Sequence, residues 1–402
     1  MMKHIDYTQA RQILLDLPVR LETETSLLDE SLGRIVSKDI FAQLPMPPFD
    51  RSPFDGYVFR VEDIPGKLRV TGTLAAGDSR LPPLEPGTAL RIFTGAPVPM
   101  EAGAVARQED TESDGETVTI PKPYAPGTNI VRAGEDKPVG TLLAAKGTRI
   151  GPGHLGVLAS QGLCQIPVYR KPKALLISTG SEVVSPGEER PPYSIYNSSY
   201  YSLSAYLQRM GFRVIPGGIV EDDPEIHFEA VKAAMDSDAD LVLTTGGASV
   251  GDYDFAFSTA KRVGAEPLFW KVNMKPGGAL LAAVRGEKLL LSLSGNPAAA
   301  LMSILVVAQP YLRKLTGMDL SLQELRLPLW NPLPKTSSAY RMLRGRLRIE
   351  KGKAYFEENP GRHNSDLSSF EHCDLIGIVP GGNGMLEAGE EIEVLHLPYD
   401  VC

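Results

Sequence analysis

The 402-residue sequence has few cysteines, no long apolar run and no long run of basic residues, and each absence excludes a class of protein. Cys164, Cys373 and Cys402 are widely spaced, so neither a disulfide framework nor a CxxC zinc site is indicated. The best apolar run, residues 298–308, is shorter than the roughly 18 residues that a membrane helix needs. Residues 1–11 are polar and mixed, unlike a signal peptide. With a formal charge of −8, the chain also lacks the basic face that duplex nucleic acid requires, so we expect a cytoplasmic protein with no membrane or nucleic-acid partner.

Familiar nucleotide-binding and catalytic patterns are missing as well. No GxGxxG opens a helix and no GxxxxGK[ST] occurs, so dinucleotide and Walker-type phosphate binding have little support. None of the six histidines is expected in a loop at a strand end, and His227 is expected on a helix surface. Catalysis by a Ser-His-Asp or Cys-His arrangement is therefore poorly supported. His363, His372 and Cys373 do not have a familiar zinc-ligand spacing.

The most informative stretch is residues 240–254, DLVLTTGGASVGDYD. Its short apolar run ends in hydroxyls and the pair Gly246-Gly247, which is typical of a buried parallel strand that leads into a tight turn. Asp252 and Asp254 follow at once. Acids, hydroxyls and bare backbone amides at the carboxyl end of a strand predict an anionic ligand that is held with a metal ion. The alternative is a glycine-rich turn that only connects two elements.

Residues 171–322 alternate between strands and helices, which is typical of a doubly wound parallel sheet. Strands are expected at 174–177, 213–215, 241–245, 268–272 and 288–293, and a further strand is expected to end in the paired acids of residues 219–224. Asn197 is expected to cap a helix that runs to Met210, and Pro224 to begin another. The fold class that follows is a multidomain α/β plus β protein.

Several chemically active residues lie just after these strands. They are Glu182, Asp222, Thr245, Gly246, Asp254, Lys271, Lys275 and Asn296. Because the carboxyl ends of parallel strands share one edge of the sheet, we expect these residues to converge there. Each of them alone is more often structural than functional, and the convergence is what predicts a site.

The flanks of the α/β segment are β-rich. Residues 67–130 have the short strands and turns of a small all-β module, and residues 327–402 have those of another. The proline-rich loop 44–57 either connects two domains rigidly or presents Asp50 or Asp55 at a fixed point.

Taken together, these motifs resemble the MoeA family, the molybdopterin molybdenumtransferases, whose animal relative is the E domain of gephyrin. The matching stretches occur in family order across essentially the whole chain. They are SPFDGY (52–57), TGA (94–96), Arg132 with GED (134–136), STGSE (178–182), DDP (222–224), TTGGASVGDYD (244–254), 271–277, SGNP (294–297) and the loop around Ser368.

The resemblance implies an elongated homodimer of four-domain subunits. An N-terminal dimerisation domain would comprise residues 1–42 and 137–170, with a β-rich domain at 43–136 inserted in it. A central molybdopterin-binding domain at 171–322 would precede a small β-barrel at 323–402. In the family, the inserted domain faces the site of the partner subunit.

The resemblance also implies a reaction. The family takes adenylylated molybdopterin and molybdate, inserts molybdenum into the dithiolene and releases AMP, with Mg²⁺ as the divalent cation. Expected partners are a molybdopterin adenylyltransferase and proteins that mature molybdoenzymes. The matching catalytic positions are Asp55, Thr94, Glu182, Asp222 and Asp254, and Asp222 and Asp254 would hold the metal. Asp254→Asn should abolish turnover without loss of the fold, and near-normal turnover would remove this residue from the site.

Substrate binding is expected from a larger set of matching positions. They are Arg132, Asp136, Thr245, Gly246, Gly247, Ser249, Lys271, Lys275, Ser294, Asn296, Pro297, Arg341 and Ser368.

Two residues depart from the family pattern. Ser294 stands where proline is usual in Pro-Gly-Asn-Pro, and Gly278 stands where a further basic residue is common. One missing charge in an anion site costs roughly 1–3 kcal/mol of binding. Alternatives are therefore a divergent paralogue with a tungstate preference and a non-catalytic scaffold like gephyrin. A nucleotide-cleaving hydrolase of the CinA kind is disfavoured by the roughly 170 residues that precede the central domain.

Overall fold

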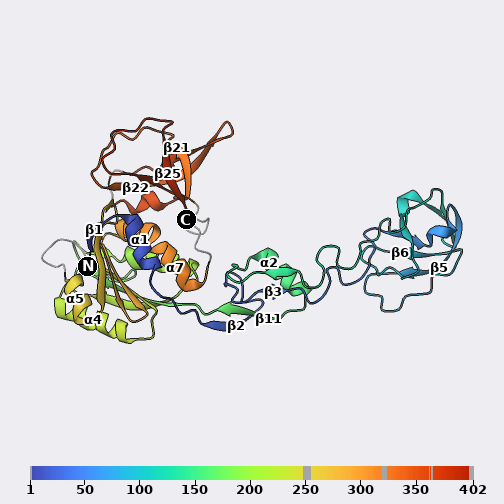
Figure 1. Ribbon diagram of the computed structural model, residues 1–402, viewed down its shortest axis with the longest axis horizontal. Helices are drawn as coiled ribbons and strands as arrows, with labels where there is room; N and C mark the ends of the chain where they lie inside the picture. The colour runs from blue at the N-terminus through green and yellow to red at the C-terminus, as the bar shows by residue number, and fades with distance from the viewer. Residues whose placement is uncertain (1, 248–254, 319–323, 362, 364, 398–402) are drawn as a thin grey trace.

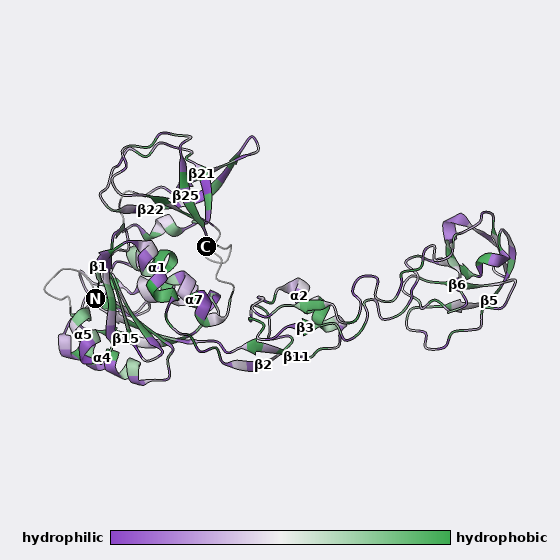
Figure 2. Ribbon diagram, viewed as in Figure 1, coloured by the Kyte–Doolittle hydropathy of each residue, from purple (hydrophilic) through white to green (hydrophobic). Residues whose placement is uncertain are grey.

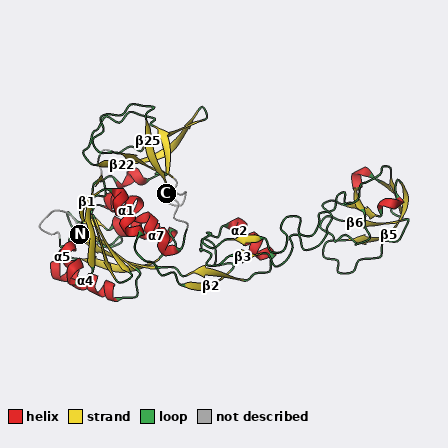
Figure 3. Ribbon diagram, viewed as in Figure 1, coloured by secondary structure: helices red, strands yellow, loops and turns green. Residues whose placement is uncertain are grey.

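The computed structural model describes residues 2–247, 255–318, 324–361, 363 and 365–397. Figure 1 shows an elongated molecule in which a large α/β domain carries a β-rich domain on one side. A narrow neck leads from the α/β domain to a separate β-rich module at the far end. Figure 3 shows that helix is concentrated in the α/β domain and strand in the other parts.

A seven-stranded sheet forms the centre of the α/β domain. In spatial order its strands are β1 (Met2–Ile5), β17 (Glu266–Val272), β19 (Leu280–Arg285), β20 (Lys288–Leu293), β16 (Leu241–Thr245), β12 (Lys173–Thr179) and β15 (Arg213–Val220). β16 pairs in parallel with both β12 and β20, and β12 pairs in parallel with β15. Only β19 runs against its neighbours, so β17 has the direction of the parallel strands. The carboxyl ends therefore meet at one edge, as the alternating sequence predicts.

Helices cover both faces of this sheet, which confirms the doubly wound class. On one face lie α1 (Tyr7–Leu15), α3 (Ser198–Arg209), α6 (Pro297–Ser303), the π-helical turn η3 (Ile304–Ala308) and α7 (Gln309–Thr316). On the other lie α4 (Pro224–Asp236) and α5 (Ala256–Arg262). Figure 2 shows mixed hydrophilic and hydrophobic colour on α4 and α5, which have one face on the sheet and one toward solvent.

The continuous helix 297–316 is the one described helix that is long and apolar enough to cross a membrane. In this structure 83% of its apolar window is buried inside the protein. This burial is the property of a core helix, because its apolar side chains are already covered by the sheet and by α1.

β1 and α1, residues 2–15, belong to the α/β domain. We had expected residues 1–42 to lie in the elongated dimerisation domain. β1 pairs with β17, and Ala10 and Leu14 on α1 are fully buried in the core beside η3. The apolar spacing of Tyr7, Ala10 and Leu14 is typical of a helix, but it does not show what the helix packs against. An amphipathic helix shows which of its faces is buried and does not show which distant element covers that face.

Arg11 fixes α1 to the core helix. Pro310 has no N–H to donate to the carbonyl oxygen of Val306 four residues before it, and the Arg11 Nε donates a hydrogen bond to this oxygen. Arg11 Nη1 lies 3.2 Å from Glu324 Oε1 in β21, and the arginine is 8% exposed. Burial lowers the pKa of the guanidinium, and the Tyr7 ring and Glu324 oppose this effect. One side chain thus ties the N-terminal helix to two other elements.

We expect Arg11→Met to destabilise the chain by about 1–3 kcal/mol, because it removes the donor to a buried carbonyl and the partner of Glu324. The measurement is urea unfolding of the full chain followed by circular dichroism. Arg20→Met, an exposed arginine beyond the same helix, is the control and should change little. Equal unfolding free energies for the two variants would contradict the anchoring role of Arg11.

The neck consists of two short antiparallel pairs and one helix. β2 (Thr23–Leu27) pairs with β11 (Gln165–Tyr169), and β3 (Ile40–Phe41) pairs with β10 (Leu142–Ala144). α2 (Pro152–Ser160) begins at a proline, which suits the first turn of a helix. The core of the neck is small, with Val36, Ile166 and Val168 fully buried.

The distal module is a six-stranded sheet, in agreement with the expected all-β texture. Its spatial order is β7 (Ala104–Arg107), β4 (Gly56–Phe59), β6 (Thr88–Ile92), β5 (Gly66–Leu74), β9 (Thr117–Ile120) and β8 (Glu112–Ser113). Two short 3₁₀ turns, η1 (Val61–Asp63) and η2 (Gln108–Asp110), follow β4 and β7.

The C-terminal domain is a small barrel, as expected. Its sheet has the order β18 (Met274–Lys275), β22 (Tyr340–Glu350), β24 (Leu375–Val379), β25 (Glu391–His396) and β21 (Glu324–Pro328), and β23 (Lys353–Glu358) pairs with the outer half of β22. Leu329, directly after β21, bridges Phe356 in β23 and so closes the sheet. The turn η4 (Leu367–Phe370) packs beside β22.

Candidate active site

A cavity of about 210 Å³ lies at the carboxyl edge of the parallel strands. The ends of β12, β15 and β16, the loop before α6 and the start of α3 contribute to it. Its lining residues are Ser178, Thr179, Glu182, Val183, Ile195, Tyr196, Asn197, Ser198, Ser199, Asp222, Thr245, Gly246, Gly247, Gly295 and Pro297. The site therefore lies where the alternating strand and helix pattern predicts it.

Gly246 is the residue that lets two strand ends approach each other. Its φ is +91°, and a Cβ there would lie 2.4 Å from the carbonyl oxygen of Thr179 at the end of β12. Its amide donates to the Leu293 carbonyl at the end of β20, with an N to O distance of 3.1 Å. Gly247 also has a positive φ, and its Cβ would lie 3.2 Å from the ring of Phe255. Only glycine permits this backbone path.

Two carboxylates reach the cavity. Ser181 and Asp222 form a reciprocal pair: the Ser181 amide donates to Asp222 Oδ2 at 3.2 Å, and the Asp222 amide donates to Ser181 Oγ at 3.1 Å. This pair holds the end of β15 beside the end of β12. Glu182 lies on the same turn, with its Oε2 2.8 Å from where a Cβ on Gly180 would lie. The cavity thus has acidic groups at the ends of β12 and β15 and the Gly246–Gly247 turn at the end of β16.

Asn197 connects the base of the cavity to a helix. Its Oδ1 accepts the Tyr200 amide at 3.1 Å as the cap of α3, and its Nδ2 donates to Ser178 Oγ at 2.9 Å. Thr179 is 6% exposed, and its hydroxyl has no hydrogen-bond partner among the described residues. Leaving a buried hydroxyl unpaired is costly, and Thr179 itself lines the cavity.

The structure brings together six of the predicted site residues at this cavity: Glu182, Asp222, Thr245, Gly246, Gly247 and Pro297. Ser294 and Asn296 flank Gly295 in the same loop but serve the backbone. The Asn296 Oδ1 accepts the Ala299 amide at 3.1 Å as the cap of α6, and Ser294 Oγ accepts the Asn296 amide at 3.2 Å.

A second group of predicted residues lies at the junction with the C-terminal barrel. β18 pairs with β22 so that Lys275 stands opposite Arg341. Ser368, in η4, is exposed near β22. Lys271, with a φ of +68°, is not part of this group: its Nζ lies 4.7 Å from the centre of the Trp270 ring, which stacks on Phe257 of α5. This cationic group is separate from the lining of the first cavity.

The structure gives a physical reason for Gly278. A Cβ at this position would lie 2.6 Å from the carbonyl oxygens of both Val272 and Met274. No side chain fits there without a backbone shift. Glycine stands here in place of a basic residue because the backbone between β18 and β19 passes close to these two carbonyl groups.

The distal module holds Asp55, Thr94, Arg132 and Asp136. Asp55 Oδ1 accepts the Thr94 amide at 2.7 Å and the Thr94 hydroxyl at 2.8 Å, and these two hydrogen bonds lower the pKa of the Asp55 carboxyl. Arg132 is ion-paired with Asp50, whose pKa is lowered first by the Ala133 amide. The Asp136 amide donates to the Met46 carbonyl.

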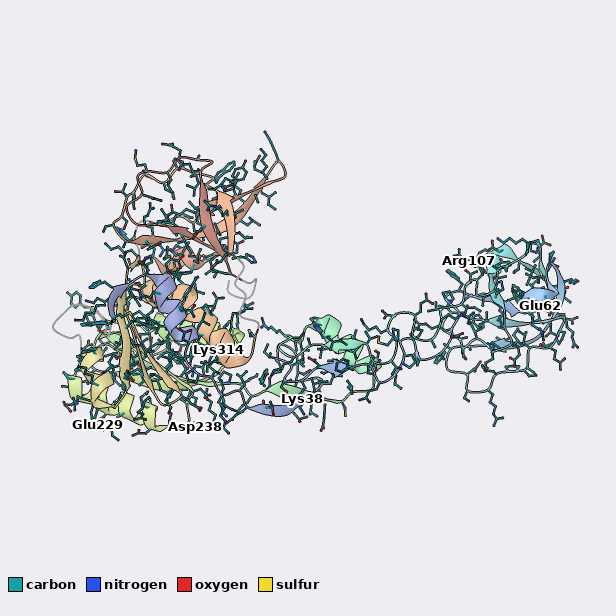
Figure 4. The ribbon with its side chains drawn as sticks, viewed as in Figure 1. Lys38, Glu62, Arg107, Glu229, Asp238 and Lys314 are labelled. Carbon is teal, nitrogen blue, oxygen red and sulfur yellow. The ribbon has the colours of Figure 1, made fainter. Side chains whose placement is uncertain are left out.

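The predicted residues of the distal module do not join the cavity within one chain. Figure 4 places Arg107 and Glu62 at one end of the molecule, and Glu229 and Asp238 at the other. The neck separates the two ends (Figure 1). Asp55 and Asp222 therefore lie in different bodies of the same chain.

Ser249 and Asp254 lie outside the described residues, so their predicted roles remain predictions. In the part of the chain that the structure describes, no group of three or more His, Cys, Asp or Glu could hold a metal. The two cavity carboxylates, Asp222 and Glu182, are nevertheless a fitting set for Mg²⁺. This ion usually binds one or two carboxylates together with substrate phosphates and water, without an all-protein cage.

Sequence reasoning missed several residues of the cavity. They are Ser178, Thr179, Tyr196, Asn197, Ser198 and Ser199. Ser178 and Thr179 lie within a strand-end motif that we noted only for Glu182. Asn197 was expected only as a helix cap. A signal was present, because a helix that begins at a strand-end site directs its free amides toward the ligand.

The expectation for His227 was wrong, because this residue is buried and not on a helix surface. It is 1% exposed on α4, its Nδ1 lies 3.1 Å from Thr259 Oγ1 on α5, and its ring lies 4.9 Å from that of Phe255. Its Nε2 finds no partner within the described ranges. Burial lowers the pKa of His227 to about 4, against the opposing field of Asp222.

We expect His227 to make the chain acid-sensitive. Its pKa is lower in the folded chain than its ordinary value of 6.5. The stability that neutral His227 contributes is therefore fully present above about pH 6.5 and is lost as the pH falls toward about 4. Across this pH range the free energy of unfolding should fall by about 3 kcal/mol. His227→Gln should flatten this part of the curve of unfolding free energy against pH, and His363→Gln, at an exposed position, should not. Parallel curves for wild type and His227→Gln would contradict the prediction.

Comparison with known proteins assigns the three parts of the chain to one family. Residues 5–162 match the MoeA N-terminal region (domains I and II), residues 175–314 match the family described as "Probable molybdopterin binding domain", and residues 326–397 match the MoeA C-terminal region (domain IV). These matches, in this order, define a chain of the MoeA type.

Similar proteins extend over nearly the full length. The chain is 33% identical to molybdopterin molybdenumtransferases of Staphylococcus epidermidis and Bacillus subtilis, over 92% and 93% of this chain and 90% of each relative. A crystal structure of a molybdopterin biosynthesis MoeA protein from Pyrococcus horikosii matches with a TM-score of 0.82 and 29% identity, covering 98% of this chain and 99% of that one. The chain belongs to the molybdopterin molybdenumtransferase family, enzymes of molybdenum cofactor biosynthesis.

Proposed function

We propose that this transferase inserts molybdenum from molybdate into adenylylated molybdopterin and releases AMP. The observation that carries the proposal is the cavity at the sheet edge, where Glu182 and Asp222 face the Gly246–Gly247 turn. Such a site suits a phosphorylated substrate, because amides and hydroxyls bind phosphate oxygens and carboxylates bind the accompanying cation.

Several groups of the cavity can bind the phosphates of the substrate. The Gly247 turn and the start of α3 at Ser198 and Ser199 offer donors to phosphate, since the first amides of a helix have no partner within the helix. These fixed groups orient the phosphoanhydride and meet charge that develops on the leaving phosphate.

Asp222 and Glu182 would hold Mg²⁺ from the described side of the cavity, with Asp254 as the remaining expected ligand. When bound, the ion neutralises phosphate charge. The Ser181 amide donates to Oδ2 of the Asp222 carboxylate and so fixes the orientation of this group.

The oxyanion would bind to the cationic group that contains Lys275 and Arg341. Opposite strand positions place the backbones of these two residues side by side, with Ser368 in the adjacent turn. Two cations and a hydroxyl suit a doubly charged tetrahedral anion such as molybdate. Tungstate has nearly the same size and charge, so a preference for it is the alternative form of the proposal.

We infer that the working form is a homodimer that shares each site between subunits. The neck exposes large apolar side chains, including Leu32 at 58%, Val139 at 61% and Phe41 at 49% exposure. Covering such side chains is favourable at about 25 cal/mol per Å², and a symmetric pair of necks would do so. Pairing of two elongated chains would let the Asp55 of one subunit approach the cavity of the other.

The test is AMP release from adenylylated molybdopterin by the purified protein, with Mg²⁺, in the presence and absence of molybdate. Release that depends on molybdate is the expected result. Pterin binding without release would overturn the catalytic proposal in favour of a scaffold. Tungstate in place of molybdate tests the metal choice. Partners would be the adenylyltransferase that supplies the substrate and the proteins that receive the cofactor, in the cytoplasm.

A further inference from the structure

A second cavity, of about 340 Å³, adjoins the first. None of the residues assigned above to the phosphates or the cation lines it. It lies between the start of α3, the edge strand β15 and the loop after β13 (Val183–Val184). Its apolar lining is Val183, Pro186, Tyr200, Tyr201, Pro216 and Ile219.

The two cavities differ in chemistry. The first is lined by two carboxylates, several hydroxyls and three glycines, whereas the second has two tyrosine rings and two prolines beside Ser185 and Glu188. Tyr200 and Tyr201 pack edge to face, with ring centres 5.4 Å apart and planes at 90°. Tyr201 is 54% exposed although it lies in a hollow. A hollow with exposed aromatic rings favours a flat, apolar ligand group.

The two cavities are neighbours and share part of one wall. Val183 and Asn197 line both of them. The strand pair β13 and β14 (Ile195–Tyr196) lies over this boundary, held by the Ile195 amide on the Glu182 carbonyl and the Asn197 amide on the Val184 carbonyl. The side chain of Asn197 is fixed by Ser178 and by the Tyr200 amide. The two cavities therefore lie side by side on a wall that hydrogen bonds hold in place.

We propose that the second cavity binds a planar heteroaromatic ring of the substrate against Tyr200 and Tyr201, while the phosphate attached to that ring system lies in the first cavity. The inference rests on the proposed function, because adenylylated molybdopterin is a phosphoanhydride with a ring system at each end. The ring that enters the cavity is adenine or the pterin, and both have the flat π-face that a tyrosine can stack against.

The experiment measures binding to the full-length protein by calorimetry with three probes: AMP, ribose 5-phosphate and a free pterin. Tyr201→Ala should weaken binding of one ring-containing probe roughly tenfold, since stacking on an aromatic side chain is worth that much in alanine substitutions. Binding of ribose 5-phosphate should not change. A selective loss for AMP identifies adenine, and a selective loss for the pterin identifies the pterin ring.

Two variants serve as matched controls. Tyr201→Phe keeps the ring and should bind as wild type does, which separates stacking from loss of the phenol. Tyr193→Ala removes a tyrosine that is 99% exposed in the neighbouring loop but does not line either cavity, and it should have no effect.

Equal binding of both ring probes by wild type and Tyr201→Ala, or no binding of either ring probe by wild type, would overturn the inference. The molybdate-dependent release assay judges the proposed function separately. If wild type releases AMP but Tyr201→Ala binds the ring probes as wild type does, the proposed ring site is wrong and the proposed function stands. If Tyr201→Ala weakens binding of a ring probe but wild type releases no AMP, the catalytic proposal is wrong and the ring site stands.

Discussion

Asp55→Asn and Asp222→Asn should each abolish AMP release, and mixed dimers of the two variants should recover about half of the wild-type rate. The reason is the separation of these residues within one chain. Asp55 lies in the distal module and Asp222 at the cavity, with the neck between them (Figure 1). In a shared-site dimer, a mixed pair has one site with both residues intact and one with both changed. A mixed dimer purified through both tags therefore has about half of the wild-type number of working sites, and an unsorted population formed by random pairing has about a quarter.

The variants are chosen to leave the local structure in place. Asparagine at 55 still offers an oxygen to the Thr94 amide and hydroxyl, and asparagine at 222 still offers one to the Ser181 amide. The measurement is AMP release after co-expression and purification of differently tagged chains.

A matched control uses Asp222→Asn with Glu182→Gln. Both residues line the same cavity, so neither subunit of a mixed dimer retains an intact site and no recovery is expected. Recovery in this control, or none in the Asp55 and Asp222 pair, would contradict a site shared between subunits.

The sequence predicted the parts of the fold that depend on local pattern. Strand β16 and the turn at Gly246–Gly247 follow from an apolar run that ends in glycines, and the structure has both where they were expected. Asn197 caps α3 and Pro224 begins α4, as their side-chain chemistry indicates. The convergence of Glu182 and Asp222 followed from strand direction alone.

Features that depend on distant contacts were not predictable in the same way. β1 joins β17 more than 260 residues later, and no local pattern shows that pairing. The residues 213–220 form one strand, β15, where the sequence suggested two, because Pro216 and Gly217 interrupt the pattern in an edge strand that tolerates them. His227 is buried because Phe255 and α5 cover it, which its own helix does not reveal.

Gly246→Ala should destabilise the chain by about 3 kcal/mol or more and abolish AMP release. Two effects combine at this position. The backbone has a φ of +91°, which an L side chain rarely adopts, and the new Cβ would lie 2.4 Å from the Thr179 carbonyl oxygen. Backbone atoms cannot move aside as a flexible side chain can, so the end of β16 must separate from the end of β12. That separation opens the wall of the cavity on which Thr179 and Thr245 lie.

The matched control is Gly153→Ala in α2. A Cβ at Gly153 has open space around it and the backbone is helical, so alanine should stabilise the chain by about 0.5–1 kcal/mol. The measurements are thermal unfolding of the full chain and AMP release for both variants. The same substitution should thus have opposite effects at the two sites, which isolates the close strand approach as the cause. An active, stable Gly246→Ala protein would mean that the β12 and β16 ends need not meet for the site to work.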